Sequence, residues 1–193
     1  MINLKDIEVE YKFKVNNKAG LTTILNKIAI KKFDRQYQCN VMFDNNQGLM
    51  QRTDGRLRVR VLGKTGNKML TYKKPLLAKG GAKREIEYEI KFRDQDEQIE
   101  KILEAIEFTP TTSYERYQSK WRLGNIHITL DEYPFTTLVE IEGTGKEIKG
   151  VSEQLGFDVR LGLTMPVDTL FQEWRKERGL SLKTQMKFDD FDK

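Results

Sequence analysis

Charged side chains recur at every second position in several segments of the chain. In IEVEYKFKV (residues 7–15) the charged members are Glu8, Glu10, Lys12 and Lys14, and every residue between them is aliphatic or aromatic. Side chains of a β-strand point alternately to opposite faces, so this spacing predicts a strand with one apolar and one fully charged face. Such a row of charges either faces water, as in a half-buried strand, or lines a charged site.

The same alternation recurs in later segments, with basic residues in some of them and acidic residues in others. Its further rows are Arg56, Arg58 and Arg60; Glu85, Glu87 and Glu89; Arg116, Gln118, Lys120 and Arg122; and Glu140 and Glu142. The formal net charge is +5, from 34 basic and 29 acidic residues. A non-specific nucleic-acid binder more often segregates a basic face or tail. Basic and acidic residues mixed in this way suit the binding of a compact polyanion together with a metal ion at least as well as the binding of nucleic acid. Charge alone leaves both interpretations open.

Composition further narrows the classes of protein to which this chain can belong. No run of about 18 apolar residues is present, and the first residues, MINLKDIEVE, lack the apolar centre of a signal peptide. We therefore expect no membrane association and a cytoplasmic protein. Cys39 is the only cysteine and His127 the only histidine. An intrachain disulfide is thus excluded, and a zinc hydrolase or a Ser-His-Asp triad has little support.

The order of predicted elements indicates one α+β domain. Strands are expected at residues 4–15, 31–44, 56–62, 68–75, 83–92, 113–123, 125–133 and 136–143. Helices are expected at 18–30, 96–106, 145–156 and 166–179. No linker or repeat divides the chain. We expect the domain to span residues 1–180, followed by residues 181–193 as a C-terminal tail, which can be mobile.

The helices need an apolar surface to cover, and this bears on which strand face points inward. If they pack on the apolar faces, the charged faces meet inside a closed eight-stranded antiparallel β-barrel. The lumen of such a barrel holds side chains and one small ligand. An open sheet with helices on one side and charges in water fits the alternation equally well.

An ordered set of short motifs resembles the CYTH superfamily, the triphosphate tunnel metalloenzymes. EVEYK at 8–12 fits the family's ExExK signature. It is followed by segments similar to the family's later strands: LRVR (57–60), LTYK (70–73), REIEYE (84–89), ER (115–116), LD (130–131) and VEIEG (139–143). The resemblance runs from about residue 7 to residue 176. It implies the closed barrel, with a charged lumen and flanking helices, rather than the open sheet.

The resemblance also implies roles for individual residues. The metal ligands would be Glu8, Glu10, Glu140 and Glu142, with Asp131 adding or orienting one. Their oxygens suit Mg²⁺ or Mn²⁺. The triphosphate would be held by Lys12, Arg58, Arg60, Lys73 and Arg116. Glu85 and Glu87 would hold a second metal or position the attacking water, which Lys12 could do as well. A salt-bridge ladder that keeps neighbouring arginines in place is the structural alternative for the two glutamates.

Two departures from the family pattern are visible. The family often has a lysine two residues before the later basic-strand arginine, where this chain has Tyr114. One phosphate contact is then missing or supplied by Lys120. The usual glycine before the closing E-x-E pair is absent from PFTTLVEIEG, which affects the local turn more than the chemistry.

The expected function is metal-dependent hydrolysis of a triphosphate: inorganic tripolyphosphate, thiamine triphosphate or a nucleoside triphosphate. The first alternative is a class IV adenylate cyclase, in which the ribose 3′-hydroxyl of ATP attacks the α-phosphorus and pyrophosphate leaves. The second alternative is a non-catalytic module that binds polyphosphate or nucleic acid. The expected partner is the small triphosphate, with nucleic acid disfavoured. Monomer and homodimer both remain open.

Overall fold

The computed structural model describes residues 7–63, 66–76, 82–94 and 97–191. Residues 4–6 of the first expected strand, residue 96 of the second expected helix and residues 192–193 of the expected tail lie outside this description.

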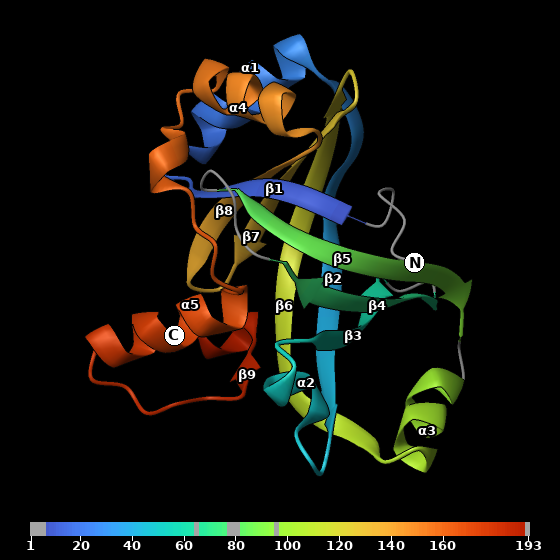
Figure 1. The fold of residues 1–193 in the computed structure, drawn as a ribbon. Coiled ribbons are helices and arrows are strands. Elements are labelled where there is room, and N and C mark those ends of the chain that lie inside the picture. The colour runs from blue at the N-terminus through green and yellow to red at the C-terminus, as the bar shows by residue number, and fades with distance from the viewer. Residues whose placement is uncertain (1–6, 64–65, 77–81, 95–96, 192–193) are drawn as a thin grey trace.

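Eight strands close into an antiparallel barrel, as the sequence predicted. The strands are β1 (Ile7–Lys14), β2 (Ile30–Asn45), β3 (Arg56–Leu62), β4 (Asn67–Pro75), β5 (Lys83–Arg93), β6 (Phe108–Leu123), β7 (Ile126–Tyr133) and β8 (Thr136–Glu142). Their order is β2-β3-β4-β5-β1-β8-β7-β6, and pairing of β6 with β2 closes the ring. Two meanders, β2 to β5 and β6 to β8, are thus joined on one side by β1 (Figure 1).

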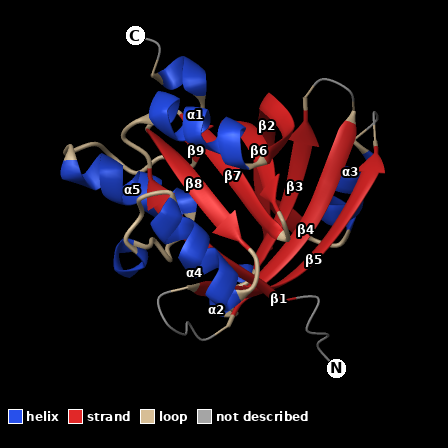
Figure 2. Ribbon diagram, turned by 90° about the horizontal axis from the view of Figure 1, so that it is seen from above, coloured by secondary structure: helices blue, strands red, loops and turns tan. Residues whose placement is uncertain are grey.

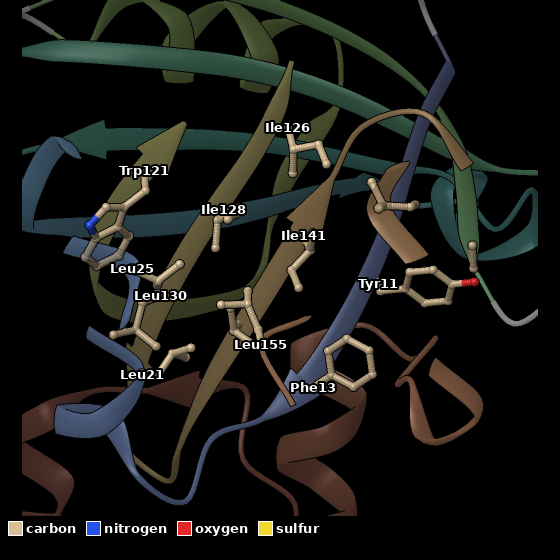
Figure 3. Close-up of a cluster of buried hydrophobic side chains, with 13 residues drawn as sticks. Tyr11, Phe13, Leu21, Leu25, Trp121, Ile126, Ile128, Leu130, Ile141 and Leu155 are labelled. Atoms are coloured by element: carbon tan, nitrogen blue, oxygen red, sulfur yellow. The ribbon is translucent and has the colours of Figure 1, made fainter. Parts of the chain in front are cut away.

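Two helices cover one outer side of the barrel through the largest hydrophobic core. α1 (Lys18–Ile28) and α4 (Gly145–Gln154) lie next to each other, near β1, β7 and β8 (Figure 1). Leu21 and Leu25 of α1, one turn apart, point toward Ile128 and Trp121 on the strands (Figure 3). On β1 the same core takes Tyr11 and Phe13, which alternate with the charged residues. The apolar faces therefore point outward to the helices and the charged faces point into the lumen.

A second, smaller core lies at the far end of the long antiparallel pair β2–β6. There α3 (Gln98–Ala105) packs Leu103 against Phe43 of β2 and Val59 of β3. The four-residue α2 (Leu49–Arg52), which the sequence analysis did not predict, begins where the Asp44 carboxylate accepts the backbone N–H groups of Met50 and Gln51 at 2.8 and 3.1 Å. Figure 2 shows α3 on the side of the barrel opposite α5.

The C-terminal part of the chain packs on the barrel and forms a unit that we call the C-terminal cap, residues 163–191. It contains α5 (Val167–Glu177), β9 (Gln185–Met186) and a 3₁₀ turn at Phe188–Asp190, and it follows another such turn at Val159–Leu161. β9 pairs in parallel with β6, with Met186 opposite Tyr114. The backbone N–H of Leu163 donates to the Lys12 carbonyl at 2.7 Å. The expected domain boundary at residue 180 stays a prediction, and the cap extends across it.

Among the helices formed by the described residues, none is long and apolar enough to cross a membrane.

Replacing Trp121 by alanine should destabilise the fold strongly, because its side chain is fully buried under the helices and its Nε1 donates to Asn26 Oδ1 at 2.9 Å. We expect the free energy of unfolding to fall by about 3–5 kcal/mol in urea titrations followed by circular dichroism. Trp174→Ala, at a half-buried position in the cap, is the matched control and should cost less. An equal or smaller loss for Trp121→Ala would contradict the packing of α1 on the barrel.

Candidate active site

The barrel lumen contains a cavity of about 530 Å³ that is lined by charged side chains. All eight strands contribute to its lining, and the first turn of α5 contributes Val167 and Asp168. The sequence prediction of a charged lumen is thereby confirmed. All predicted site residues except Asp131 line the cavity: Glu8, Glu10, Lys12, Arg58, Arg60, Lys73, Glu85, Glu87, Arg116, Lys120, Glu140 and Glu142.

One wall of the cavity is acidic and is built by the adjacent strands β5, β1 and β8. Glu10 of β1 stands directly opposite Glu142 of β8, and Glu8 stands opposite Glu85 of β5. Like charges at facing positions of a sheet destabilise it, more so where burial removes water. This wall therefore needs cations close by.

Three lysines supply part of that positive charge and bridge the carboxylates. Lys12 Nζ lies 3.3 Å from Glu10 and 3.0 Å from Glu140. Lys83 Nζ lies 3.3 Å from Glu10 and 2.7 Å from Glu85. Lys73 contacts Glu8 and lies 3.3 Å from Glu87, and Arg56 pairs with Glu85. Burial disfavours the Lys12 cation, but Glu10 and Glu140 outweigh burial and raise its pKa well above the ordinary value.

Negative charge on this wall is nevertheless only partly compensated. Among the described residues, Glu142 has no ion-pair partner, and burial raises its pKa, aided by Glu87 and Glu10 against the opposing effect of Lys120 and Lys73. Burial likewise raises the pKa of Glu8 to about 8; Glu10, Glu87 and Glu142 act in the same direction, against Lys73. Both shifts identify a place where a further cation is favourable.

The opposite wall is basic and comes from β3 and β6, which flank β2. Arg60 Nε donates to Asn40 Oδ1 at 2.9 Å, and Arg58 Nη1 donates to the Tyr114 hydroxyl at 3.1 Å. Neither guanidinium has a carboxylate partner in the described part of the chain, and Arg58 Nε has no hydrogen-bond acceptor there. Burial lowers the pKa of Arg60 to about 9, together with the neighbouring cations Arg58 and Arg116. An anion in the cavity would accept hydrogen bonds from these guanidinium groups and would offset the repulsion between the arginine cations.

Asp131 supports the basic wall from outside the cavity lining. It is fully buried, accepts from Arg116 Nη1 at 2.9 Å and accepts from Gln118 Nε2 at 2.8 Å. Arg116 Nε in turn donates to Gln38 at 2.8 Å. Burial disfavours the Arg116 cation, but Asp131 outweighs it and raises the pKa of Arg116. Burial raises the pKa of Asp131 and Glu140 acts in the same direction, so Asp131 stays close to one of the four glutamates with which the sequence analysis grouped it. Its role in adding or orienting a metal ligand stays a prediction.

Several lining residues were not assigned to the site from the sequence. Lys83 shares the spacing of Glu85 and Glu87, so the alternation already contained its signal. Gln38 carries no charge and gave no such signal, although it holds Arg116. The same is true of Asn40, which does not line the cavity but holds Arg60. His127, treated as an ordinary strand residue, lines the cavity opposite Glu142.

The donor set of the acidic wall suits a hard divalent cation. Within the described residues, no three His, Cys, Asp or Glu side chains converge on a ready-made metal position, because lysines bridge the carboxylates. Carboxylate oxygens of Glu8, Glu10, Glu140 and Glu142 are nevertheless the ligands that Mg²⁺ and Mn²⁺ prefer. A cation bound there would take over carboxylates that the lysine ammonium groups now hold.

Comparison with known proteins places this geometry in a family. Residues 6–157 match the CYTH domain family. A candidate adenylate cyclase of Methanocaldococcus jannaschii is 28% identical over 149 residues, which is 77% of this chain and 81% of that protein.

Solved structures share the fold at low sequence identity. A candidate adenylate cyclase of Vibrio parahaemolyticus superposes with a TM-score of 0.75 at 16% identity, over 86% of this chain and 98% of that one. A candidate adenylyl cyclase from Hippeastrum, described as having a dominant triphosphatase activity, gives a TM-score of 0.51 at 17% identity, over 95% and 94%.

The crowding of carboxylates should be measurable as pH-dependent stability. Because the pKa of Glu142 is raised in the folded protein, its contribution is fully present below the ordinary carboxyl pKa and is lost as pH rises through the raised value. In the presence of chelator, we expect Glu142→Gln to make the fall of the unfolding free energy with rising pH shallower. Urea titrations at a series of pH values measure this, with exposed Glu153→Gln as control. An unchanged slope would contradict the proposed crowding.

Proposed function

The chain belongs to the CYTH domain family, and on that premise we propose that it is a divalent-metal-dependent phosphohydrolase acting on triphosphate-containing substrates. The observation that carries the proposal is the division of the cavity into two walls. Two guanidinium groups, of buried Arg60 and half-buried Arg58, have no carboxylate partner in the described part of the chain, and they face a wall in which carboxylates outnumber their cations. A polyphosphate against the arginines and a divalent cation against the carboxylates would satisfy both walls at once.

The basic residues would bind and orient the phosphate chain. Guanidinium groups of Arg58, Arg60 and Arg116 match phosphate oxygens with paired N–H donors. Arg116 is the most firmly positioned of them, because Asp131 and Gln38 hold it from two sides. Lys120 lines the same cavity and adds a mobile positive charge. Fixed donors of this kind stabilise the charge that develops on phosphoryl oxygens during transfer.

The carboxylates of Glu8, Glu10, Glu140 and Glu142 would hold Mg²⁺ or Mn²⁺. When bound, such an ion neutralises the phosphate charge and lowers the pKa of a coordinated water. Lys12, whose pKa is raised between Glu10 and Glu140, stays protonated. It therefore suits a contact to a phosphate oxygen better than abstraction of a proton from water.

Glu87 is the better of the two candidates for orienting the attacking water. Glu85 is almost fully buried and is occupied by Arg56 and Lys83. Glu87 pairs only with Lys73 in the described part of the chain, at 3.3 Å, and its side chain is 22% exposed. An accessible carboxylate with a free oxygen can accept a hydrogen bond from water and direct it at phosphorus.

Adenylate cyclase activity is the second candidate function, because the relative from Methanocaldococcus jannaschii carries that name. Cyclisation needs the ribose 3′-hydroxyl aligned on the α-phosphorus, which requires contacts to the nucleoside. The cavity residues that carry charge recognise phosphate, and they serve hydrolysis without any nucleoside contact. Hydrolysis is therefore the first expectation.

A substrate panel tests the proposal directly. The protein is incubated with tripolyphosphate, thiamine triphosphate and ATP, each with Mg²⁺ and with Mn²⁺, and phosphate, pyrophosphate and cyclic AMP are quantified. We expect phosphate release that chelator abolishes and that Glu10→Gln lowers at least about 100-fold through loss of a metal ligand. Exposed Glu104→Gln is the control.

Other product patterns identify the other functions. Cyclic AMP and pyrophosphate from ATP, with tripolyphosphate left intact, would establish the cyclase instead. Metal-independent binding without turnover of any substrate would establish a non-catalytic polyphosphate-binding module.

Arg58→Ala should mainly weaken substrate binding, since the guanidinium lies in the cavity and has no carboxylate to release. We expect KM to rise by the equivalent of about 1–3 kcal/mol, the cost of one lost charge-assisted contact. Steady-state kinetics on the best substrate measure it, with Arg160→Ala, in an exposed pair with Asp158, as control. An unchanged KM would remove Arg58 from the phosphate site.

A further inference from the structure

The phenol of Tyr114 lies within the basic wall, where two of the three arginines have no carboxylate partner among the residues that the structure describes. Tyr114 is 7% exposed and its hydroxyl accepts from Arg58 Nη1 at 3.1 Å. Arg60 of β3 and Arg116 of β6 are its other charged neighbours. A phenol is neutral or negative but never positive, so it is suited to sit among cations.

The rest of the described surroundings of Tyr114 fixes the ring, mainly through apolar contacts. Met186 of β9 stands opposite Tyr114 in the sheet, and the Tyr133 ring of β7 lies 5.9 Å away between centroids. The elements packed around it contribute apolar side chains to the same cluster: Leu138 from β8, Met42 from β2, and Val167 and Phe171 from α5. Asp168, in the first turn of α5, lines the same cavity. The ring is thus held by the C-terminal cap while its hydroxyl faces the arginines.

We propose that Tyr114 is a positioning residue of the phosphate site whose phenol orients Arg58 and takes up a proton when a polyphosphate enters. This rests on the proposed function, because it requires the arginines to be the phosphate-binding groups. In the empty protein, at pH values above the lowered pKa of Tyr114, the phenolate offsets the arginines. In the complex the phosphate oxygens do so, the phenolate becomes one negative charge too many, and it takes a proton from solvent.

The electrostatics of the empty cavity favour this exchange. Burial raises the pKa of the Tyr114 phenol, but Arg58, Arg116 and Arg60 together outweigh burial and lower it. A bound polyanion cancels the effect of the arginines, so the phenol pKa must be higher in the complex. A group whose pKa rises on binding takes up a proton, and the affinity for the anion therefore falls as pH rises through the lower of the two values.

The test compares wild-type protein, Tyr114→Phe and the control Tyr117→Phe, in which a tyrosine on the opposite face of the same strand is changed. Binding of tripolyphosphate in chelator is measured by calorimetry from about pH 7 to about pH 10, the range in which a tyrosine with a lowered pKa titrates. Ultraviolet difference absorption of tyrosinate, with and without tripolyphosphate, reports the phenol itself and needs no catalytic activity.

We expect the wild-type spectrum to contain a tyrosine that Tyr114→Phe removes, that Tyr117→Phe retains and that tripolyphosphate shifts to higher pH. At neutral pH, Tyr114→Phe should raise the Kd about tenfold, because Arg58 loses its acceptor. With rising pH, the Kd of wild-type protein should increase more steeply than that of Tyr114→Phe.

Binding of tripolyphosphate with an unchanged Tyr114 titration, or with the same pH dependence in wild-type and Tyr114→Phe protein, would overturn the inference alone. Absence of binding to wild-type protein would overturn the proposed function and the inference with it. If Tyr114→Phe does not fold, the tyrosinate absorption of wild-type protein with and without sulfate, which does not titrate in this range, decides the question. Loss of tyrosinate on binding supports the inference, and unchanged tyrosinate overturns it.

Discussion

The structure depends on one constraint: charges enclosed in a small cavity must be balanced within it. Taking a carboxylate or a guanidinium out of water costs several kcal/mol unless opposite charge or hydrogen bonds replace the water. The acidic wall meets this requirement partly through lysines that bridge carboxylates, and the basic wall partly through amides and a phenol. The charge left over on each wall is opposite in sign. The proposed ligand, a polyanion with a metal ion, would bring both signs and complete the balance.

The same constraint accounts for the architecture around the cavity. Once the charged faces turn inward, each strand presents its apolar face outside, and that face must be covered. α1 and α4 cover β1, β7 and β8, and α3 covers the far end of the antiparallel pair β2–β6. The helices are therefore part of the reason that the barrel can keep its charges inside. Buried Trp121 and Ile128 belong to the outer core, although they alternate with residues that face the site.

Much of this could be predicted from the sequence, because alternation identifies strands and their two faces. Alternation and the helices' need for an apolar surface could not decide which face points inward; the resemblance to the family motifs decided it. Asp131 has the spacing of a site residue, but Arg116 and Gln118 engage both of its oxygens, which only the three-dimensional pairing reveals. β6 begins at Phe108, five residues before the predicted start. Pro110 obscured this first part of the strand in the sequence, although β2 pairs with it in the structure. β9 is two residues long and gave no signal.

The closure of the barrel has a consequence for how the protein is made. β1 is synthesised first, yet its partner β8 ends at residue 142, and β2 pairs with a strand about 80 residues later. During translation, β1 therefore lacks its partner β8, and the β2–β5 meander lacks its partner β6, until most of the chain has left the ribosome. Until then their apolar and charged faces are both exposed. Such distant pairings slow folding and leave unpaired strand edges open to association. Glu10 and Glu142 come face to face only when β8, the last barrel strand in the sequence, pairs with β1.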